Sequence, residues 1–314
     1  MDEKKRLVFE AARLCYELGL SQRQVADDLG VSPATLTRLL QRARDLGIVT
    51  FQVKPPEAQT KDAAALKRKI KRHTSLKEVL ITLSSPTIEI VRREMGHLCA
   101  QWVQSALKYG MSVGFSGGRS VLQAIPFLKP GAADIHVVQL MGGISPTEID
   151  IQADVIARNA AAKLGGTCHV IHGPAIFPTA RELEQLLKHR IVANVIDSFA
   201  QMDVCVVGVG SFTADNPLMQ FDMLSASEEK RLKAAGCVGD ICGRFFDGEG
   251  RECDPALSAR ILGIRLDQLA AVPRVCVVAA GGEKVEAILG ACRAKIPHTL
   301  ITDTVTAEAL ADGS

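Results

Sequence analysis

Four glycine turns are the places in this sequence where residue types and spacing could bind a phosphate. They are Gly117-Gly118 followed by Arg119-Ser120, Gly142-Gly143, Gly208 and Gly210 followed by Ser211, and Gly281-Gly282 followed by Lys284. Glycine permits close backbone approach, N–H groups at a helix start attract anions, and a cationic side chain adds a full charge. The sequence has neither a GxxxxGK[ST] loop nor a GxGxxG fingerprint with a following acidic residue, which disfavours nucleoside triphosphates and dinucleotides. We therefore predict a site for a smaller phosphorylated metabolite.

Some of the candidate ligand-binding residues could instead have a purely structural role. A glycine turn can simply end a strand, and Arg119 could brace its own loop instead of binding a ligand. Asp240 lies between apolar residues in a segment that resembles a strand, so it is either a structural carboxylate or a group that binds ligand hydroxyls, and we favour the second role. The predicted effector-binding residues are Gly117, Gly118, Arg119, Ser120, Gly142, Gly143, Gly210, Asp240 and Lys284.

An enzyme is the alternative function for the same residues. A sugar-phosphate isomerase or deaminase would need a carboxylate base and a nearby acid or cation, and Asp240 with Lys284 could serve. The glycine loops carry no second well-placed acid and no histidine constellation, so we predict no enzymatic activity, no cofactor and no metal site.

The elements that would position these residues form an alternating pattern from about Glu78 onward. Apolar, β-branched runs alternate with amphipathic stretches, which predicts a Rossmann-like α/β domain with a mostly parallel sheet and helices on both faces. The expected strands are 79–83, 111–115, 136–140, 168–171, 204–209, 275–279 and 299–301, and the expected helices are 91–107, 151–164, 181–199 and 283–294. The carboxyl ends of parallel strands share one sheet edge, so the glycine loops can converge on one crevice.

A separate pattern from Gly19 to Gly47 predicts two short helices across a tight turn. Ser21 and Gln24 fit a capping box at the start of the first helix, and Ser32 followed by Pro33 fits an N-cap with proline at the first helical position of the second. This arrangement predicts an all-α helix-turn-helix, with 48–53 as a short strand or wing. An ordinary αα-hairpin is the alternative.

The outward residues of the second helix suit the major groove of double-stranded DNA. Leu36, Leu39, Leu40 and Ala43 recur at helical spacing and should face the first helix, which leaves small and polar side chains outside. The predicted DNA-binding residues are Gln22, Ser32, Ala34, Thr35, Thr37, Arg38 and Arg42.

The whole composition limits the classes of partner. The chain has 314 residues, with 37 basic and 35 acidic side chains and a net charge of +2, so there is no global basic field for nucleic acid. The exception is 61–73, where a basic run predicts a helix that is either a solvated linker or a contact to phosphates. Nine cysteines without C-x-x-C spacing, no export signal and no long apolar span predict a soluble protein of the reducing cytoplasm.

Six segments together resemble the SorC family of bacterial transcription regulators. They are VGFSGGRSV (113–121), VVQLMGGIS (137–145), DVCVVGVGS (203–211), GCVGDICGRFFDGEG (236–250), VCVVAAGGEKVEAI (275–288) and LITDTVTAEAL (300–310). The resemblance implies a helix-turn-helix before an effector domain related to sugar-phosphate isomerases. It also implies a phosphorylated sugar or sugar alcohol bound by Gly118, Arg119, Ser120 and Lys284, with Asp240 on its hydroxyls. The family usually has an aromatic residue where Gly117 stands and threonine where Ser120 stands.

The predicted organisation follows from these patterns. Residues 1–54 form the DNA-binding domain, 55–75 a linker helix, and 76–314 the effector-binding and oligomerisation domain. We expect a homodimer or homotetramer that binds a palindromic operator under control of a phosphorylated carbohydrate, with no membrane partner.

Overall fold

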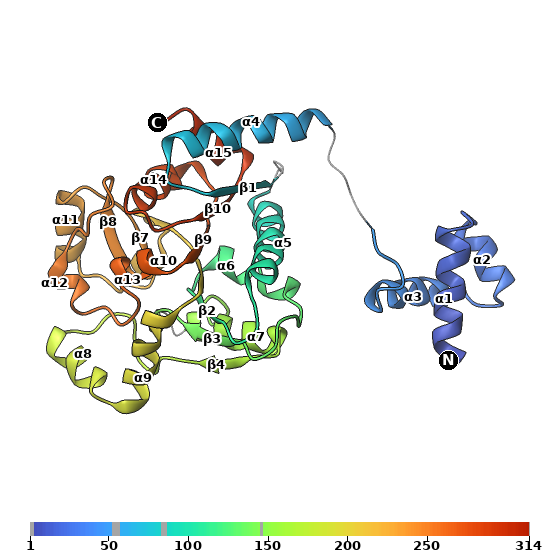
Figure 1. The fold of residues 1–314 in the computed structure, drawn as a ribbon, viewed down its shortest axis with the longest axis horizontal. Coiled ribbons are helices and arrows are strands. Elements are labelled where there is room, and N and C mark those ends of the chain that lie inside the picture. The colour runs from blue at the N-terminus through green and yellow to red at the C-terminus, as the bar shows by residue number, and fades with distance from the viewer. Residues whose placement is uncertain (1–2, 52–56, 83–86, 145–146, 314) are drawn as a thin grey trace. The chain divides into compact units, whose positions relative to one another are not determined.

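The computed structural model describes residues 3–51, 57–82, 87–144 and 147–313 (Figure 1). The chain divides between Gln59 and Thr60 into two compact units. None of the helices in these ranges is both long and apolar enough to cross a bilayer.

The smaller unit contains α1 (Glu3–Tyr16), α2 (Gln22–Asp28) and α3 (Pro33–Asp45). Val25, Ala26, Leu36 and Leu40 form its core with Ala11 of α1. The core residues of α3 recur at i and i+4, which is the spacing of one helix face. The two-helix pattern predicted for 19–47 is therefore confirmed.

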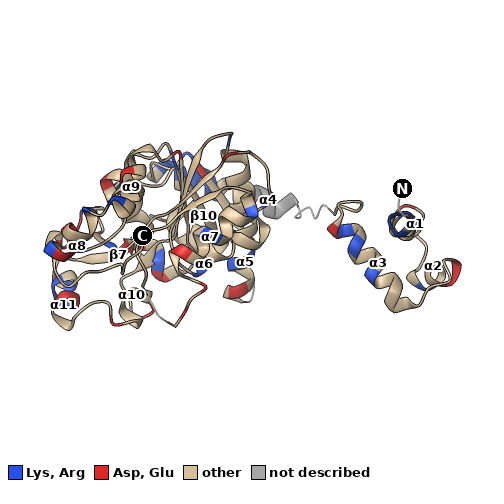
Figure 2. Ribbon diagram, turned by 90° about the horizontal axis from the view of Figure 1, so that it is seen from below, with Lys and Arg blue, Asp and Glu red and all other residues tan. Residues whose placement is uncertain are grey.

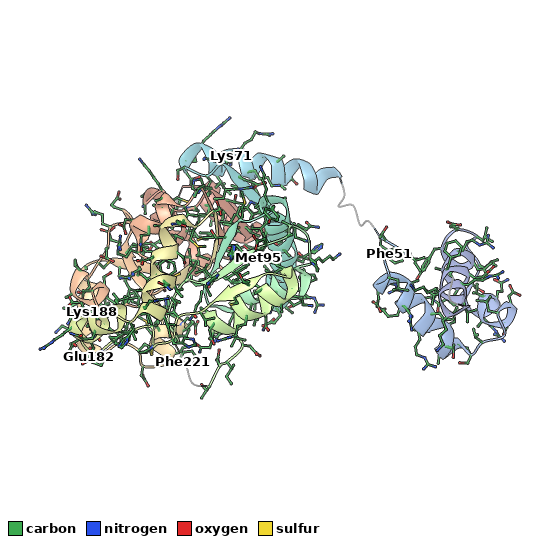
Figure 3. All side chains as sticks on the ribbon, turned by 60° about the horizontal axis from the view of Figure 1, so that its bottom comes forward. Phe51, Lys71, Met95, Glu182, Lys188 and Phe221 are labelled. Atoms are coloured by element: carbon green, nitrogen blue, oxygen red, sulfur yellow. The ribbon has the colours of Figure 1, made fainter. Side chains whose placement is uncertain are left out.

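The predicted wing differs from the structure. Residues 48–51 form no strand, and 52–53 lie outside the described residues. The N–H groups of Ile48 and Val49 donate to the carbonyl of Ala43 at the end of α3, so this segment follows the helix end instead of pairing with another strand. Phe51, which is labelled in Figure 3, belongs to this segment. Its ring packs edge-to-face on that of Tyr16, with 5.3 Å between the ring centroids.

The larger unit is built on a parallel seven-stranded sheet in the order β1-β10-β9-β5-β2-β3-β4. Its strands are β1 (Glu78–Thr82), β2 (Ser112–Phe115), β3 (His136–Gln139), β4 (Thr167–His169), β5 (Val204–Val207), β9 (Arg274–Val278) and β10 (Thr299–Asp303). A second, antiparallel sheet contains β6 (Gly210–Ser211), β7 (Cys237–Ile241) and β8 (Arg244–Asp247). The predicted α/β class with a mostly parallel sheet is confirmed.

Helices cover both faces of the seven-stranded sheet. The longer helices are α4 (Glu57–His73), α5 (Ile88–Ala106), α7 (Ala153–Leu164), α8 (Ala180–Leu187), α9 (Arg190–Ser198), α11 (Ala226–Ala234), α14 (Val285–Arg293) and α15 (Thr304–Ala311). Short turns are α6 (Arg119–Leu122), α10 (Pro217–Gln220), α12 (Pro255–Ser258), α13 (Leu266–Ala271), η1 (Ile125–Phe127), η2 (Phe199–Gln201) and η3 (Gly282–Lys284). The stretch predicted as one helix, 181–199, is two helices, because His189 has an extended backbone between them.

The side chains of each strand pack alternately in two cores, because successive side chains point to opposite faces of the sheet. Val204 and Val206 of β5 pack in the core that includes α5 and α7, whereas Cys205 and Val207 pack in the core that includes α9, α14 and α15. The predicted linker helix corresponds to α4, and its fully buried Ile70 belongs to this second core.

Candidate functional site

Two N-caps set the direction of the helices in the smaller unit. At α2, Ser21 Oγ accepts from the N–H of Gln24 at 3.3 Å, and Gln24 Oε1 accepts from the N–H of Ser21 at 3.1 Å. At α3, Ser32 Oγ accepts from the N–H of Thr35 at 3.2 Å, and Pro33 occupies the first helical position. Both caps agree with the sequence pattern, since each satisfies donors that the helix itself leaves free.

The outer face of α3 carries the predicted DNA-binding residues. Ser32, Ala34, Thr37, Arg38 and Arg42 are exposed, Thr35 is half-exposed, and Gln22 is exposed on α2. Figure 2 shows the cationic positions along α3. Arg38 Nη2 donates to Thr35 Oγ1 at 3.4 Å, and Thr37 Oγ1 donates to the carbonyl of Pro33 at 3.0 Å. The helix thus presents a hydroxyl and a guanidinium side by side at its first two turns, within reach of a groove.

A cavity of about 290 Å³ lies in the larger unit, beyond the carboxyl ends of β2, β5 and β9. These three strands are neighbours in the sheet, and the chain order reverses between β5 and β2. Such a reversal separates the loops that leave the two strands, and it is where open parallel sheets bind ligands. The cavity is lined by seven of the nine predicted effector-binding residues: Gly117, Gly118, Arg119, Ser120, Gly210, Asp240 and Lys284.

The loop after β2 turns sharply at Gly118, whose φ of 115° favours glycine. Ser116 links this loop to the end of β5, the neighbouring strand in the sheet. Its Oγ donates to the carbonyl of Gly117 at 2.9 Å and accepts from the N–H of Gly208 at 3.1 Å. Within the described residues, the N–H groups of Arg119 and Ser120 donate to no acceptor. The turn therefore offers two backbone donors to the cavity, along with the largely buried Ser120 hydroxyl.

Asp240 is both braced within the protein and exposed to the cavity. Its Oδ1 accepts from Asn216 Nδ2 at 2.8 Å and its Oδ2 accepts from the N–H of Gly243 at 3.0 Å. Burial raises the pKa of this carboxyl, and the two hydrogen bonds oppose the rise. An oxygen held in this way still has lone pairs for a ligand hydroxyl. The two roles considered for Asp240 are compatible.

The two predicted cations have different surroundings. Lys284 is half-buried, and its Nζ makes no hydrogen bond or ion pair with the part of the chain that the structure describes. Burial lowers its pKa, and the charges of Arg92 and Arg119 lower it further, while Glu283 and Asp240 oppose the change. Arg119 instead donates from Nη2 to Glu148 at 3.4 Å and to Gln220 at 3.2 Å. Lys284 is the cation whose charge lacks a direct partner, which favours an anion beside it.

Gly142 and Gly143 do not line this cavity. Their N–H groups donate to the carbonyls of Leu262 and Gly173 at 2.8 and 3.0 Å, and a β-carbon on Gly142 would lie 2.5 Å from the carbonyl oxygen of Pro174. These glycines allow close packing between loops, so their donors are used inside the fold.

Several lining residues carried no sequence signal. Arg92 of α5 reaches the cavity from a helix with no ligand-binding motif, and Asp215 and Asn216 come from the segment between β6 and α10. Only Asn216, which precedes Pro217, had a recognisable pattern, that of a helix cap. Its side chain also donates to Asp240, and that contact between distant segments is visible only in the folded chain.

Comparison with known proteins gives two family matches. Residues 58–311 match the family described as "Putative sugar-binding domain", and residues 1–49 match the "Homeodomain-like domain" family. The chain is 31% identical over 310 residues to the deoxyribonucleoside regulator of Bacillus subtilis (strain 168), covering 98% of each chain. It is 29% identical over 309 residues to the sorbitol operon regulator of Klebsiella pneumoniae, covering 97% of each.

The crystal structure of the full-length sorbitol operon regulator SorC from Klebsiella pneumoniae has the same architecture. It covers 99% of both chains with a TM-score of 0.79 and 29% identity. These relatives are named transcriptional regulators, which agrees with the prediction of no enzymatic activity and gives no support to the isomerase or deaminase alternative. The chain belongs to the SorC family of transcriptional regulators, with a helix-turn-helix DNA-binding unit and a sugar-binding domain.

Proposed function

We propose that a phosphorylated sugar or sugar alcohol binds the cavity of the larger unit and controls operator binding in the cytoplasm. The observation that carries this proposal is the combination of an unpaired, half-buried Lys284 with the free N–H groups of Arg119 and Ser120. A phosphate would accept from these donors and compensate the lysine charge. Asp240 and Asn216, which also line the cavity, would bind sugar hydroxyls.

The DNA partner in this proposal is a palindromic operator read by α3. Ser32, Thr37 and Arg42 would contact phosphates, Ala34 would allow close entry, and Thr35 and Arg38 would contact base edges. Gln22, exposed on α2, would add a contact from the first helix.

Assembly into a homodimer or homotetramer would join the two functions. A palindrome fixes the spacing of two α3 helices, so a ligand that binds two subunit arrangements with unequal affinity changes operator occupancy. Molar mass from light scattering, with and without the effector, measures the subunit number. A monomer that binds the operator at full affinity would contradict this part of the proposal.

A thermal-shift screen tests the ligand class. Each sugar phosphate is paired with its unphosphorylated sugar, because a ligand that binds only the folded chain raises the melting temperature by mass action. We expect at least one phosphorylated member to raise it while its unphosphorylated partner does not. In Lys284→Ala that increase should shrink, with the melting temperature of the free protein little changed.

The result that would overturn the proposal is equal stabilisation by phosphorylated and unphosphorylated sugars, or by none. The effector identified in this way is then added to a gel-shift titration with operator DNA. Unchanged operator affinity at saturating effector would reject control of DNA binding while leaving the ligand site intact.

A further inference from the structure

A second hollow of about 380 Å³ adjoins the cavity on the side of α5. Arg92 and Arg119 line both spaces, and Glu89, Arg93 and Gln123 line the second one. The two guanidinium groups therefore lie at the boundary between the cavity and the hollow. Three arginines face the hollow against a single carboxylate.

Close packing of α5 on the loop after α6 puts Arg92 at this boundary. Gly96 of α5 has no side chain, and a β-carbon there would lie 2.2 Å from the carbonyl oxygen of Gln123. Arg92 precedes Gly96 by four residues and so lies on the same helix face, one turn earlier. Because Gly96 has no side chain, α5 can pack close to α6, and this places the guanidinium group of Arg92 near Arg119 and Ser120 at the start of α6.

The charges at this boundary are poorly compensated. Arg92 makes no hydrogen bond or ion pair with any described residue. Arg119 pairs with Glu148 at 3.4 Å, but both side chains are about 40% exposed (38% and 44%), so water screens the pair. Arg93 lies over the ring of Phe127 at 5.8 Å and has no carboxylate partner in the described chain. The fields of Arg92 and Arg119 also reach Lys284, because both lower its pKa. Crowded cations of this kind favour a bound anion.

We infer that the effector carries two anionic groups, one bound by Ser120 and Lys284 in the cavity and the other bound by Arg92 and Arg93 in the hollow. The inference rests on the proposed function, which supplies the first anion as a sugar phosphate. The second group is a phosphate or a carboxylate, because a guanidinium donates two parallel N–H bonds to either. The ligand class is therefore a sugar bisphosphate or a phosphorylated sugar acid.

Calorimetric titration of the full chain with matched probes tests this inference. Three pairs are used: fructose 6-phosphate with fructose 1,6-bisphosphate, ribose 5-phosphate with ribose 1,5-bisphosphate, and glucose 6-phosphate with 6-phosphogluconate. In at least one pair we expect the doubly anionic member to bind roughly tenfold or more tightly than its partner, as one added charge-assisted contact predicts.

The variant Arg93→Gln separates the two subsites, because Arg93 lines the hollow and not the cavity. It should reduce the tenfold preference to about threefold or less while leaving the affinity for the singly anionic probe within about twofold. Arg231→Gln removes one charge from α11, away from both spaces, and should leave the preference unchanged. The fluorescence of Trp102, the single tryptophan, checks that each variant is folded.

The outcomes distinguish this inference from the proposed function. Doubly anionic members that bind no better than singly anionic ones, or a preference that survives Arg93→Gln, would overturn the second subsite alone. If none of the six probes binds, the second subsite is likewise rejected. If the unphosphorylated sugars stabilise the chain as well as the phosphates do in the thermal-shift screen, the proposed function fails and this inference fails with it.

Discussion

The outer face of α3 and the cavity of the larger unit both present cations, but water surrounds them differently. Arg38 and Arg42 on α3 are exposed, whereas Lys284 is half-buried with a lowered pKa. Salt screens the electric field of exposed charges, whereas burial disfavours the charged form of a lysine and so lowers its pKa. Operator affinity should therefore depend on salt concentration and on the number of cationic side chains on α3. Effector affinity should depend on pH and on whether residue 284 is lysine or arginine.

The two regions also differ in how much of the chain builds them. The α2–α3 surface uses residues 21–42, and its two helices are started by local caps. The cavity draws residues from 92 to 284. A site assembled from distant segments depends on buried hydrogen bonds between loops. Mutations that remove such hydrogen bonds should destabilise the larger unit and leave the α2–α3 surface unchanged.

The largest expected effect comes from Arg244→Met. Arg244 is 4% exposed and donates to the carbonyls of Ser258, Ile261, Gly263 and Ile264. Methionine keeps much of the volume but leaves the buried carbonyls of Ile261, Gly263 and Ile264 without the donors that Arg244 supplies, so we expect a loss of about 3–5 kcal/mol in the free energy of unfolding. Urea unfolding followed by Trp102 fluorescence measures it, because Trp102 lies in the larger unit.

Arg231→Met is the matched control for this change. Its side chain is 52% exposed and pairs with Asp254 at 3.0 Å, so the expected loss is below about 1 kcal/mol. Equal losses in the two variants would show that the buried brace contributes no more than a surface pair, and the contrast between the regions would fail.

Arg38→Ala should weaken operator binding by roughly ten- to a hundredfold, as the loss of one base contact predicts. Effector binding should not change, since Arg38 belongs to the other unit. A gel-shift titration measures the first quantity and calorimetry the second. Lys188→Ala removes the same charge from an exposed position after α8 (Figure 3) and should leave operator affinity nearly intact. Equal operator affinity for Arg38→Ala would refute the assigned face of α3.

The pH dependence of the two binding reactions sharpens the comparison further. A phosphate binds the charged form of Lys284, whose pKa is lowered by burial, so effector affinity should fall as pH rises through that lowered pKa. Above it the fall approaches tenfold per pH unit, and it begins at a lower pH than an ordinary lysine would give. Calorimetry between pH 7 and 10 with a phosphorylated sugar that binds measures the decline.

Lys284→Arg should remove this decline, because a guanidinium stays charged over the whole range. The α3 surface carries arginines, so operator affinity without effector should change by less than about threefold over the same pH range. An equal decline in Lys284→Arg would assign the titration to another group.

The difference in assembly also explains what the sequence could predict. Caps at Ser21 and Ser32 and the buried stripe of α3 follow from neighbours within four residues, and the structure has them. The prediction of a strand or wing at 48–53 was wrong for residues 48–51, because a strand needs a pairing partner and a local pattern cannot show whether one exists. In the larger unit the Gly118 turn was predictable, since its positive φ requires glycine.

Residues that meet through distant packing were not predictable. Arg92 and Arg93 are neighbours in α5, and the packing of Gly96 against Gln123 helps to place Arg92, one turn before Gly96, in the lining of the cavity. Gly142 and Gly143 were assigned to the cavity because they follow a strand, yet their loop pairs with residues 173–175 and 262. Strand ends predict where a site lies, and the loops that cover it decide which residues contact the ligand.

The smallest predicted effect uses two capping boxes, one in each unit. Ser21 with Gln24 begins α2, and Ser225 with Glu228 begins α11. Ser21→Ala removes a cap worth about 1 kcal/mol, and this loss should speed amide hydrogen exchange in α2 roughly fivefold. Ser225→Ala should act only on the larger unit, where Arg260 still holds Glu228, and should cost less. If Ser21→Ala also speeds exchange in the strands of the larger unit, the two units unfold together, and the separate responses to salt, pH and mutation argued for them cannot hold.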